Sequence, residues 1–231
     1  MKLIINGDDL GYTMGNTLGI LEAYRNGILR STTALTNSKY IKEAADLVKQ
    51  YPGLGVGVHL TLTLGAPLTE NRTLHDENGN FYPGRKTIWE KNPDYDEIYA
   101  EWKAQIERFI EVFGHLPTHL DSHHSVHDAT EKAKEISLRL AKEYGLPLRR
   151  YSDYQFVAGF YGPTATREDL MRILKENSGK DIEIMCHPGY CDLELYRMSS
   201  YSWQRVQELD VLCSNEIKQF LEENGIEPVH Y

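Results

Sequence analysis

A short strand-like segment, Thr118-His119-Leu120-Asp121-Ser122-His123, lies between two stretches with helical periodicity, residues 97–113 and 129–144. In the first stretch, large apolar residues recur every three or four positions, which places them on one stripe of a helix. Helix, strand and helix in succession indicate parallel strands that are joined by right-handed crossovers. This local order is typical of an α/β fold.

The same alternation runs through the rest of the chain. Further strands are predicted at residues 3–6, 31–36, 54–64, 146–151 and 182–186, and further helices at 17–26, 40–51, 167–177 and 214–224. Six or seven strand–helix units favour a barrel over an open sheet, although the count alone does not decide between them. In either architecture, the residues that carry out chemistry gather at the carboxyl ends of the strands.

Two long connections, residues 65–95 and 188–201, are rich in turn residues and aromatic residues. Connections of this length typically form lids or binding walls, and the alternative is an insertion on the surface. No linker, repeat or low-complexity stretch divides the 231 residues, so a single domain is predicted.

The composition, with 41% hydrophobic and 26% charged residues, is that of a globular protein and excludes a disordered or fibrous chain. The net charge of −9 argues against binding to nucleic acid or to an anionic membrane, because both require a basic surface. No apolar run approaches the roughly 18 residues of a membrane span, and the first five residues lead directly into polar ones, unlike a signal peptide. Three cysteines without metal-type spacing indicate a reduced, cytoplasmic protein.

Carboxylate and imidazole side chains occur where predicted strands end. Asp8 and Asp9 end the first strand, His59 ends the third, and His187 follows the strand at 182–186. Two adjacent carboxylates are costly to bury unless they bind a cation or exchange protons, although a helix cap or turn is the structural alternative. A single histidine at a strand end, such as His59, is more often structural than a metal ligand.

The richest group of such side chains is His119-Leu120-Asp121-Ser122-His123-His124-Ser125-Val126-His127. Residues two apart in a strand share a face, so His119, Asp121 and His123 are predicted to point the same way. His124 is predicted to point to the other side, and His127 to lie where the chain turns into the next helix. Several imidazoles with a carboxylate are ligands that zinc and similar divalent metals prefer. We therefore predict metal binding or proton transfer here, because a packed core would leave these imidazoles without hydrogen-bond partners.

Taken together, these residues meet the requirements of a catalytic metal site. Such a site needs about three protein ligands and one open position. Asp9, His59 and one histidine of the cluster could supply the ligands from three different strands. Asp8 is then left to act as a base and His187 as an acid, which predicts metal-assisted hydrolysis.

Five segments carry a resemblance to a known family. They are Asn6-Gly7-Asp8-Asp9-Leu10-Gly11, Gly27-Ile28-Leu29-Arg30-Ser31-Thr32-Thr33-Ala34-Leu35, Gly57-Val58-His59-Leu60-Thr61-Leu62, Pro117-Thr118-His119-Leu120-Asp121-Ser122-His123-His124 and Met185-Cys186-His187-Pro188. With these segments the chain resembles the YdjC-like family of carbohydrate deacetylases over nearly its whole length, and most resembles its chitooligosaccharide deacetylases. The resemblance implies one domain, residues 1–231, folded as a distorted TIM-like (β/α) barrel with an incomplete or irregular strand set.

The resemblance also implies a metal-dependent enzyme that hydrolyses an N-acetyl group from an acetylated amino sugar such as diacetylchitobiose. Asp9, His59 and His123 match the metal ligands, Asp8 matches the base, and His187 matches the histidine of the carboxyl-terminal motif. Such ligands suit one divalent ion, Zn²⁺ or a similar transition metal, and Mg²⁺ is less natural for imidazole. Many relatives carry histidine where this chain has Ser125, so the proton network of the cluster is expected to differ.

Several roles stay open on the sequence alone. His187 or His127 is expected to protonate the leaving amine, and His127 could instead support a ligand from behind. Of Arg149 and Arg150, one is expected to hold Asp8 ionised and the other to form a surface salt bridge; we take Arg150 as the candidate. The alternative functions are a phosphoesterase-like barrel hydrolase, which would need basic residues near the metal, and a non-catalytic, metal-stabilised sugar-binding protein. The many aromatic residues suggest stacking on sugars and a homodimer.

Overall fold

Seven strands form one parallel sheet, which the computed structural model describes together with the rest of residues 1–231. Their order across the sheet is β4-β3-β2-β1-β6-β5, and β7 pairs with the beginning of β1. The strands are β1 (Lys2–Leu10), β2 (Ser31–Ala34), β3 (Gly55–Leu60), β4 (Leu120–Ser122), β5 (Gln155–Phe156), β6 (Ile182–Cys186) and β7 (Glu227–Val229). Every strand pair is parallel, which is the arrangement that helical crossovers produce.

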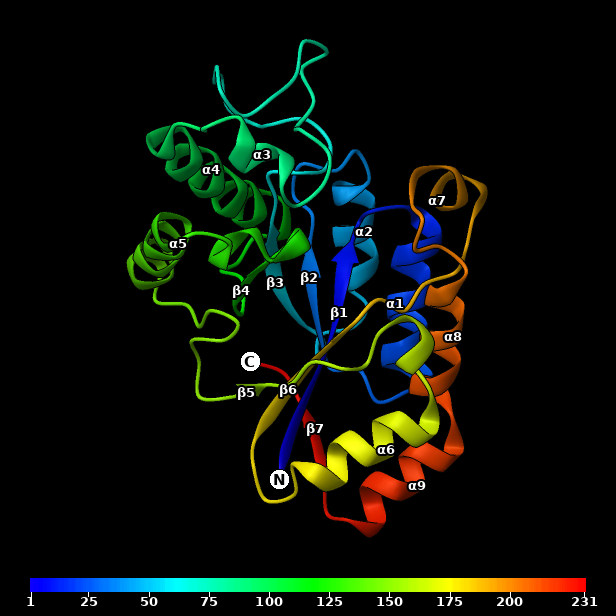
Figure 1. Cartoon of the computed structure of the whole chain (residues 1–231). Helices are drawn as coiled ribbons and strands as arrows, with labels where there is room; N and C mark the ends of the chain where they lie inside the picture. The colour runs from blue at the N-terminus through cyan, green and yellow to red at the C-terminus, as the bar shows by residue number, and fades with distance from the viewer.

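The sheet curls into a partial barrel, and one chain segment joins its two edges (Figure 1). Leu148 forms an isolated parallel bridge with Leu120 of β4. A few residues later, Gln155 pairs with Ile182 of β6 at the opposite edge. The predicted α/β fold, a distorted barrel with an irregular strand set, is confirmed.

Helices surround the sheet and cover its outer side (Figure 1). They are α1 (Met14–Asn26), α2 (Ile41–Val48), α3 (Thr87–Glu90), α4 (Tyr95–Phe113), α5 (Glu131–Tyr144), α6 (Arg167–Glu176), α7 (Leu193–Met198), α8 (Gln204–Cys213) and α9 (Asn215–Glu223). Neighbouring helices contact one another in the pairs α1 with α8, α4 with α5, and α6 with α9. None of these helices combines the length and the apolar character that crossing a membrane requires.

Helix α4 shows how local sequence sets an element and its packing. It begins after Asp94, whose side chain accepts a hydrogen bond from the backbone N–H of Asp96, and ends at Gly114, whose φ of 79° suits glycine. The predicted apolar stripe faces inward, and Trp102 and Phe109 are fully buried. Burying one such side chain contributes about 1.5–3 kcal/mol to stability.

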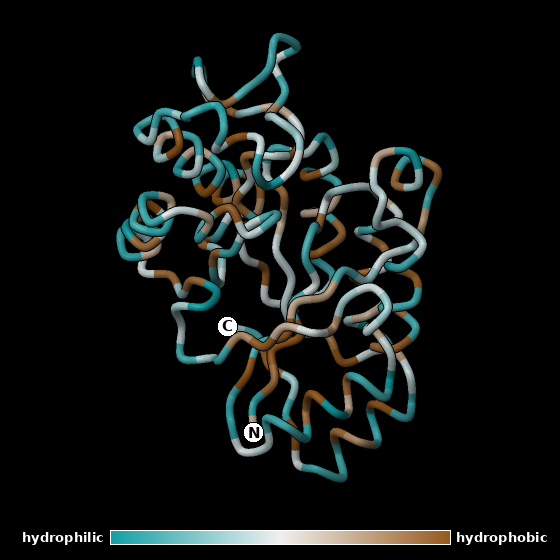
Figure 2. The backbone as a smooth tube through the Cα atoms, viewed as in Figure 1, coloured by the Kyte–Doolittle hydropathy of each residue, from teal (hydrophilic) through white to brown (hydrophobic).

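One contiguous core underlies the whole chain, as a single domain requires. It contains 46 buried hydrophobic residues drawn from every strand except β5 and β7 and from nearly all the helices. Hydrophobic segments lie along the central strands, whereas the long loop at the top of the view is largely hydrophilic (Figure 2).

Helix α1 approaches the connection after β6 unusually closely, and this contact positions the segment that carries His187. A Cβ atom added at Gly19 would lie 2.4 Å from the Cα atom of Gly189, so only glycine allows this approach. Close by, the backbone N–H of Tyr190 donates to the carbonyl oxygen of Gly15 at 3.0 Å.

The predicted strands differ from the observed ones mainly around the barrel's irregular side. The prediction of a strand at residues 146–151 is wrong, because only Leu148 pairs and Arg150 adopts a left-handed φ of 70°. The strand predicted at 118–123 is shorter: it begins only at Leu120 and ends at Ser122, because a 3₁₀ turn (His123–Asp128) follows directly. The strands β5 and β7 and the helices α7 and α8 were not predicted. The first three are only two to six residues long, and the apolar residues of α8 show little helical periodicity.

Candidate metal centre and active site

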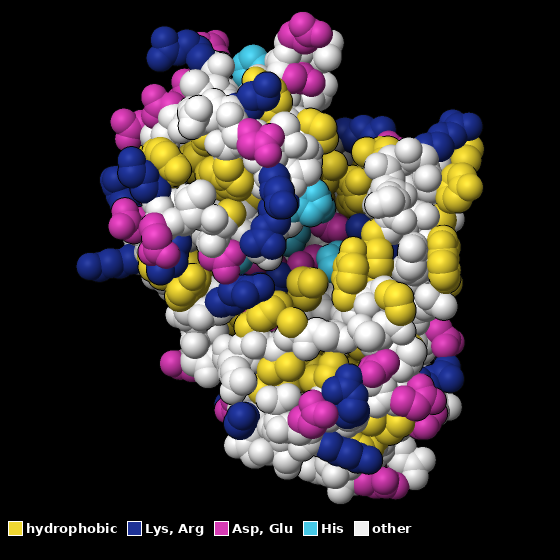
Figure 3. All heavy atoms as spheres, in the orientation of Figure 1, with side chains coloured by type: hydrophobic (Ala, Val, Ile, Leu, Met, Phe, Trp, Pro, Cys, Tyr) yellow, Lys and Arg dark blue, Asp and Glu magenta, His cyan; other side chains and the backbone are white.

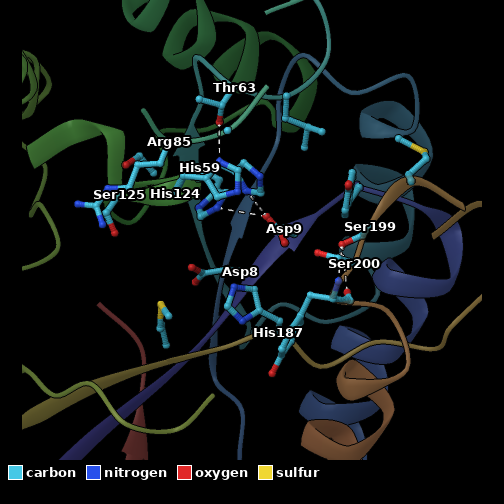
Figure 4. Close-up of a pocket in the computed structure, with 18 of the residues that line it drawn as sticks. Asp8, Asp9, His59, Thr63, Arg85, His124, Ser125, His187, Ser199 and Ser200 are labelled. Atoms are coloured by element: carbon cyan, nitrogen blue, oxygen red, sulfur yellow. Dashed lines mark hydrogen bonds and ion pairs between the residues drawn. The ribbon is translucent and has the colours of Figure 1, made fainter. Parts of the chain in front are cut away.

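A cavity of about 510 Å³ opens where β1, β3, β4 and β6 end, which is the face where a parallel barrel places its chemistry. Histidine and acidic side chains are visible in a hollow at the middle of this face (Figure 3). Both long connections form part of its wall, through residues 83–85 and residues 198–201, as predicted. Figure 4 shows Asp8, Asp9, His59 and His187 turned toward the same central space.

Three side chains converge in this cavity with their donor atoms directed at one another. The Oδ1 atom of Asp9 lies 3.2 Å from Nε2 of His59 and 2.9 Å from Nδ1 of His123. All three donor atoms lie within 4.8 Å of one another, and His123 is partly open to the cavity. One carboxylate and two imidazoles with a free side match the donor set and the open position of a catalytic divalent-metal site.

The surroundings of His59 also suit a cation. Its other ring nitrogen, Nδ1, lies 2.7 Å from Asp121 Oδ1, an arrangement that orients a metal-ligating imidazole through a carboxylate behind it. Burial lowers the pKa of His59, but the carboxylates of Asp121, Asp9 and Asp8 outweigh burial and raise it to about 10. The carboxylates therefore stabilise positive charge at this point, and the residues present fit a divalent ion.

Asp9 is held from the side opposite the two histidines. Its Oδ2 atom accepts a hydrogen bond from Arg205 at 2.8 Å, and its backbone carbonyl accepts one from Asn16 at 2.9 Å. Burial raises the pKa of Asp9, but the charges of His123 and Arg205 outweigh burial and bring the pKa well below its usual value, so the carboxylate stays ionised. The φ angle of Asp9 is 73°, a left-handed conformation that is uncommon for aspartate and typical of functional sites.

Asp8 lies beside this centre and is fixed by a buried arginine. The guanidinium group of Arg149 donates to both carboxylate oxygens, at 2.9 and 2.8 Å, and Asn6 donates to Oδ1 at 2.8 Å. Burial raises the pKa of Asp8, but the charge and hydrogen bonds of Arg149 outweigh it and hold the pKa well below its usual value. Arg149 also contacts Asp121 at 2.8 Å and Glu183 at 2.7 Å, so one buried cation joins three carboxylates.

A second acidic group, formed by Asp8, His59 and Asp121, has donor atoms equally close together. All three residues are buried, and Arg149 already supplies positive charge to both carboxylates. The first group is therefore the better candidate for a metal, because its His123 is partly exposed, whereas Arg149 pairs with both carboxylates of the second group.

The arginine that contacts Asp8 is Arg149, which corrects the choice of Arg150. Arg150 is exposed; it pairs with Asp128 at 3.3 Å and lies over the ring of Phe156 at 4.4 Å. Arg150 adopts a left-handed φ of 70° outside any strand, so strand alternation does not predict which of the two arginines faces Asp8.

His187 lines the cavity on the side of β6. Its ring packs edge-on against Tyr161 and Tyr201, with centroids 5.5 Å apart in both cases. Its Nδ1 atom has no hydrogen-bond partner and lies 4.0 Å from Oε1 of Glu208. Burial and then the charge of Arg205 lower the pKa of His187 to about 4, so the isolated ring is neutral at pH 7.

Glu208 is a buried carboxyl group directly behind His187. It accepts hydrogen bonds from the backbone N–H of His187 and from the hydroxyl of Tyr201. Burial raises its pKa to about 7 in spite of these donors. The pair of His187 and Glu208 can therefore hold one proton near neutral pH beside the cavity.

Comparison with known proteins identifies the family. The model of the family described as YdjC-like protein matches residues 2–223. The chain belongs to the YdjC-like protein family.

Several relatives match this chain over nearly its full length. A carbohydrate deacetylase of Clostridium beijerinckii is 38% identical over all of this chain and 99% of its own length. A chitooligosaccharide deacetylase of Yersinia enterocolitica is 38% identical over 96% of this chain and 95% of its own. A crystal structure from Enterococcus faecalis, whose description proposes cellobiose-phosphate cleavage, superposes with a TM-score of 0.93 at 37% identity and covers 100% and 97% of the two chains.

A more distant structure has the same fold. The family 4 carbohydrate esterase of Streptomyces lividans superposes with a TM-score of 0.56 at 13% identity, covering 97% of this chain and 90% of its own. At this identity the likeness concerns the fold alone.

The histidine cluster of this YdjC-like chain is arranged differently from a regular strand. His124 lines the cavity, so the prediction that it points to the other side is wrong. It has a left-handed φ of 55°. Its ring packs against that of His123 at a tilt of 37°, with centroids 4.1 Å apart, and its Nδ1 atom lies 3.0 Å from the hydroxyl of Thr63. The alternation rule fails here because the chain leaves the strand at Ser122.

His119 and His127 lie outside the cavity lining. His127 is fully buried, with Nδ1 hydrogen-bonded to Ser122 and Nε2 without a partner, and burial lowers its pKa to about 3. His119 is stacked on Tyr231 with centroids 4.1 Å apart. Neither imidazole has direct access to a substrate in the cavity.

Several residues in or behind the cavity have no signal in the sequence. Arg205 and Tyr12 line the cavity, Glu208 lies behind His187, and none of the three belongs to one of the segments that predicted the site. Only their contacts with residues far away in the chain reveal them; Arg205, for example, is 196 positions from Asp9.

Proposed function

We propose that this protein is a carbohydrate deacetylase that removes an N-acetyl group from an acetylated amino sugar of the chitooligosaccharide type. The observation that carries the proposal is the cavity itself. It places an Asp9–His59–His123 donor set with a free side next to an ionised carboxylate, Asp8, that is fixed by an arginine. The names of the full-length relatives support the same substrate class.

Asp9, His59 and His123 would hold one divalent ion in this proposal. The two imidazoles favour Zn²⁺ or another transition metal over Mg²⁺. When bound, the ion would polarise the amide carbonyl and lower the pKa of a neighbouring water molecule. Asp121 fixes the orientation of His59 from behind, and Arg205 fixes Asp9.

Asp8 is the proposed general base. Its carboxylate takes a proton from the attacking water as the new C–O bond forms at the acetamide carbon. Arg149 keeps Asp8 ionised and keeps both oxygens in place, so the carboxylate needs no reorganisation when the substrate arrives.

His187 is the proposed proton donor to the leaving nitrogen. A neutral imidazole can give up its Nε2 proton if its Nδ1 atom gains one at the same time. Glu208 is the proposed partner for this transfer: its Oε1 atom lies 4.0 Å from Nδ1, so the proton would pass through one bridging water or after a small approach of the two groups, and burial raises the pKa of Glu208 to about 7. The C–N bond then breaks, acetate and the free amine leave, and the proton on Asp8 restores the pair through solvent. His127 has no such access from its buried position.

The test is acetate release from N,N′-diacetylchitobiose by the metal-loaded protein. The wild type is expected to release acetate, Asp8→Asn is expected to bind the metal but lose turnover, and His123→Ala is expected to lose metal affinity as well. Matched assays with 4-nitrophenyl phosphate examine the phosphoesterase alternative. If no acetylated sugar yields acetate, the proposed function is wrong. In that case, equal sugar binding by the wild type and by Asp8→Asn would favour a non-catalytic sugar-binding protein.

A further inference from the structure

Tyr231 approaches the interior of the barrel from the end opposite the cavity. Strand β7 pairs with residues Lys2 to Ile4 at the beginning of β1, whereas the cavity opens at the end of that strand. The red segment after β7 runs toward β4 and β5 (Figure 1), and Tyr231 does not line the cavity. Any influence of this residue on the active site must therefore pass through the side chains that fill the barrel.

The ring of Tyr231 is held in place by two aromatic neighbours. It stacks on His119 with centroids 4.1 Å apart and an interplanar angle of 22°, and it meets Tyr154 edge-on at 5.7 Å. His119 is fully buried, and it fits beside β3 because Gly57 has no side chain: a Cβ atom there would lie 2.6 Å from Nδ1 of His119. Such aromatic pairs have preferred geometries, so these contacts direct the hydroxyl of Tyr231 to one place.

That hydroxyl donates a hydrogen bond to Glu183, a fully buried carboxylate on β6. The Oε2 atom of Glu183 accepts from Tyr231 at 2.5 Å, and Oε1 accepts from Nε of Arg149 at 2.7 Å. Burial raises the pKa of Glu183, and both Arg149 and the Tyr231 hydroxyl oppose that rise. Each carboxylate oxygen thus has one donor, and loss of the Tyr231 hydroxyl would leave a buried acceptor without a partner, which is costly.

One guanidinium group connects Glu183 to Asp8. The Nε atom of Arg149 donates to Glu183, and its two terminal nitrogens donate to the two oxygens of Asp8 at 2.9 and 2.8 Å. Because a guanidinium group is planar and rigid, fixing its Nε–H also fixes the direction of its terminal N–H groups. The orientation of Asp8 is therefore coupled to Tyr231 through two buried charged side chains.

We propose that Tyr231 is a positioning residue for Asp8: its hydroxyl fixes Glu183, which sets the guanidinium of Arg149 and thereby the carboxylate of Asp8. The inference rests on the proposed deacetylase function, in which Asp8 is the general base. It adds a residue that lies outside the cavity, and it gives His119 the task of supporting the ring of Tyr231.

The test is the variant Tyr231→Phe, which keeps the ring and removes only the hydroxyl. With N,N′-diacetylchitobiose and saturating metal, kcat is expected to fall about tenfold, a part of the roughly 10²–10⁴-fold that a general base contributes. KM is expected to change less than about twofold, because Tyr231 does not line the cavity. Tyr154→Phe is the matched control and is expected to keep the wild-type kcat. It removes a hydroxyl that makes no hydrogen bond to Glu183 from a ring that touches the same aromatic group.

A double-variant comparison separates positioning from a general loosening of the fold. In a Glu183→Gln background the link is already broken, because an amide offers an acceptor on only one side and cannot serve both Tyr231 and Arg149. There, Tyr231→Phe is expected to lower kcat by less than about twofold further. A wild-type kcat in Tyr231→Phe, or the same tenfold loss in both backgrounds, would overturn the proposal.

The side chain of Arg149 offers a readout that does not depend on turnover. Its buried Nε–H donates to Glu183 and is expected to give a slowly exchanging ¹⁵N–¹H signal, assigned by side-chain correlation. Tyr231→Phe is expected to shift this signal and to speed its exchange with solvent, and Tyr154→Phe to leave it unchanged. If no acetylated sugar yields acetate, the proposed function fails, and this measurement still judges the link: a changed signal supports it, and a signal identical to that of the wild type would overturn it.

Discussion

Glu208 provides a quantitative test of the electrostatics behind His187, through the variant Glu208→Gln. The folded protein holds the Glu208 pKa at about 7, against an ordinary value of 4.5 in the unfolded chain. Between these values the folded state keeps a proton that the unfolded state has lost, so the free energy of unfolding falls as the pH rises. Below pH 4.5 this penalty is absent, and above pH 7 it is complete. The glutamine variant does not titrate and has no such dependence.

The size of the effect follows from the same two pKa values. A shift of one pKa unit corresponds to about 1.4 kcal/mol, so the stability of the wild type relative to Glu208→Gln should fall by about 2–3 kcal/mol between pH 5 and pH 8. Urea unfolding of both proteins at several pH values, with a chelator present, measures this difference. Titration of all other groups cancels in the comparison, and the chelator removes any contribution from pH-dependent metal binding.

A constant difference in unfolding free energy from pH 5 to pH 8, with equal m-values, would refute the reasoning. Glu208 would then be ionised in the folded protein at its ordinary pKa. It could not supply a proton to His187 near neutral pH, and the proposed route of the proton to the leaving nitrogen would have to be abandoned.

Three further predictions concern the supports of the site. Arg149→Met should lower the free energy of unfolding by about 3–5 kcal/mol, because it leaves three buried carboxylates without their cation. Arg150→Ala should change the free energy of unfolding by less than about 1 kcal/mol. Urea unfolding measures both variants, and equal effects would contradict the assignment of Arg149 as the partner of Asp8. Asp121→Asn should weaken metal binding about 10- to 100-fold by releasing the orientation of a ligand, which competition with a chelating dye measures; wild-type affinity would remove Asp121 from this role. Gly19→Ala should cost about 1–3 kcal/mol of stability and lower kcat by displacing the segment that carries His187, and a fully active, equally stable variant would show that the helix contact is dispensable.

The sequence indicated the fold class from its alternation of strand-like and helical segments. Ile182 and Trp102, for example, belong to segments with a regular apolar pattern, and both side chains are fully buried in the structure. The irregular side of the barrel could not be predicted from the sequence, because the single bridge at Leu148 and the two residues of β5 are too short to show a hydrophobic pattern.

The candidate site was only partly accessible from the sequence. Asp8, Asp9 and His59 could be located because parallel strands bring their carboxyl ends to one face, whichever residues lie between them in the chain. The roles of His124, His127 and Arg150 could not be predicted from strand alternation, because these residues lie where the chain has already left the regular strand.

The sequence by itself thus determined which strand ends carry carboxylates and imidazoles, since hydrophobic periodicity depends only on neighbouring residues. Tertiary structure alone decided which of those groups meet. In the folded chain Arg149 binds Asp8, Glu208 lies behind His187, and Tyr12 lines both the first cavity and a second one beside it. The physical reason is that left-handed backbone conformations redirect side chains locally, while contacts between distant segments, such as Arg205 and Asp9, depend on the packing of the whole barrel.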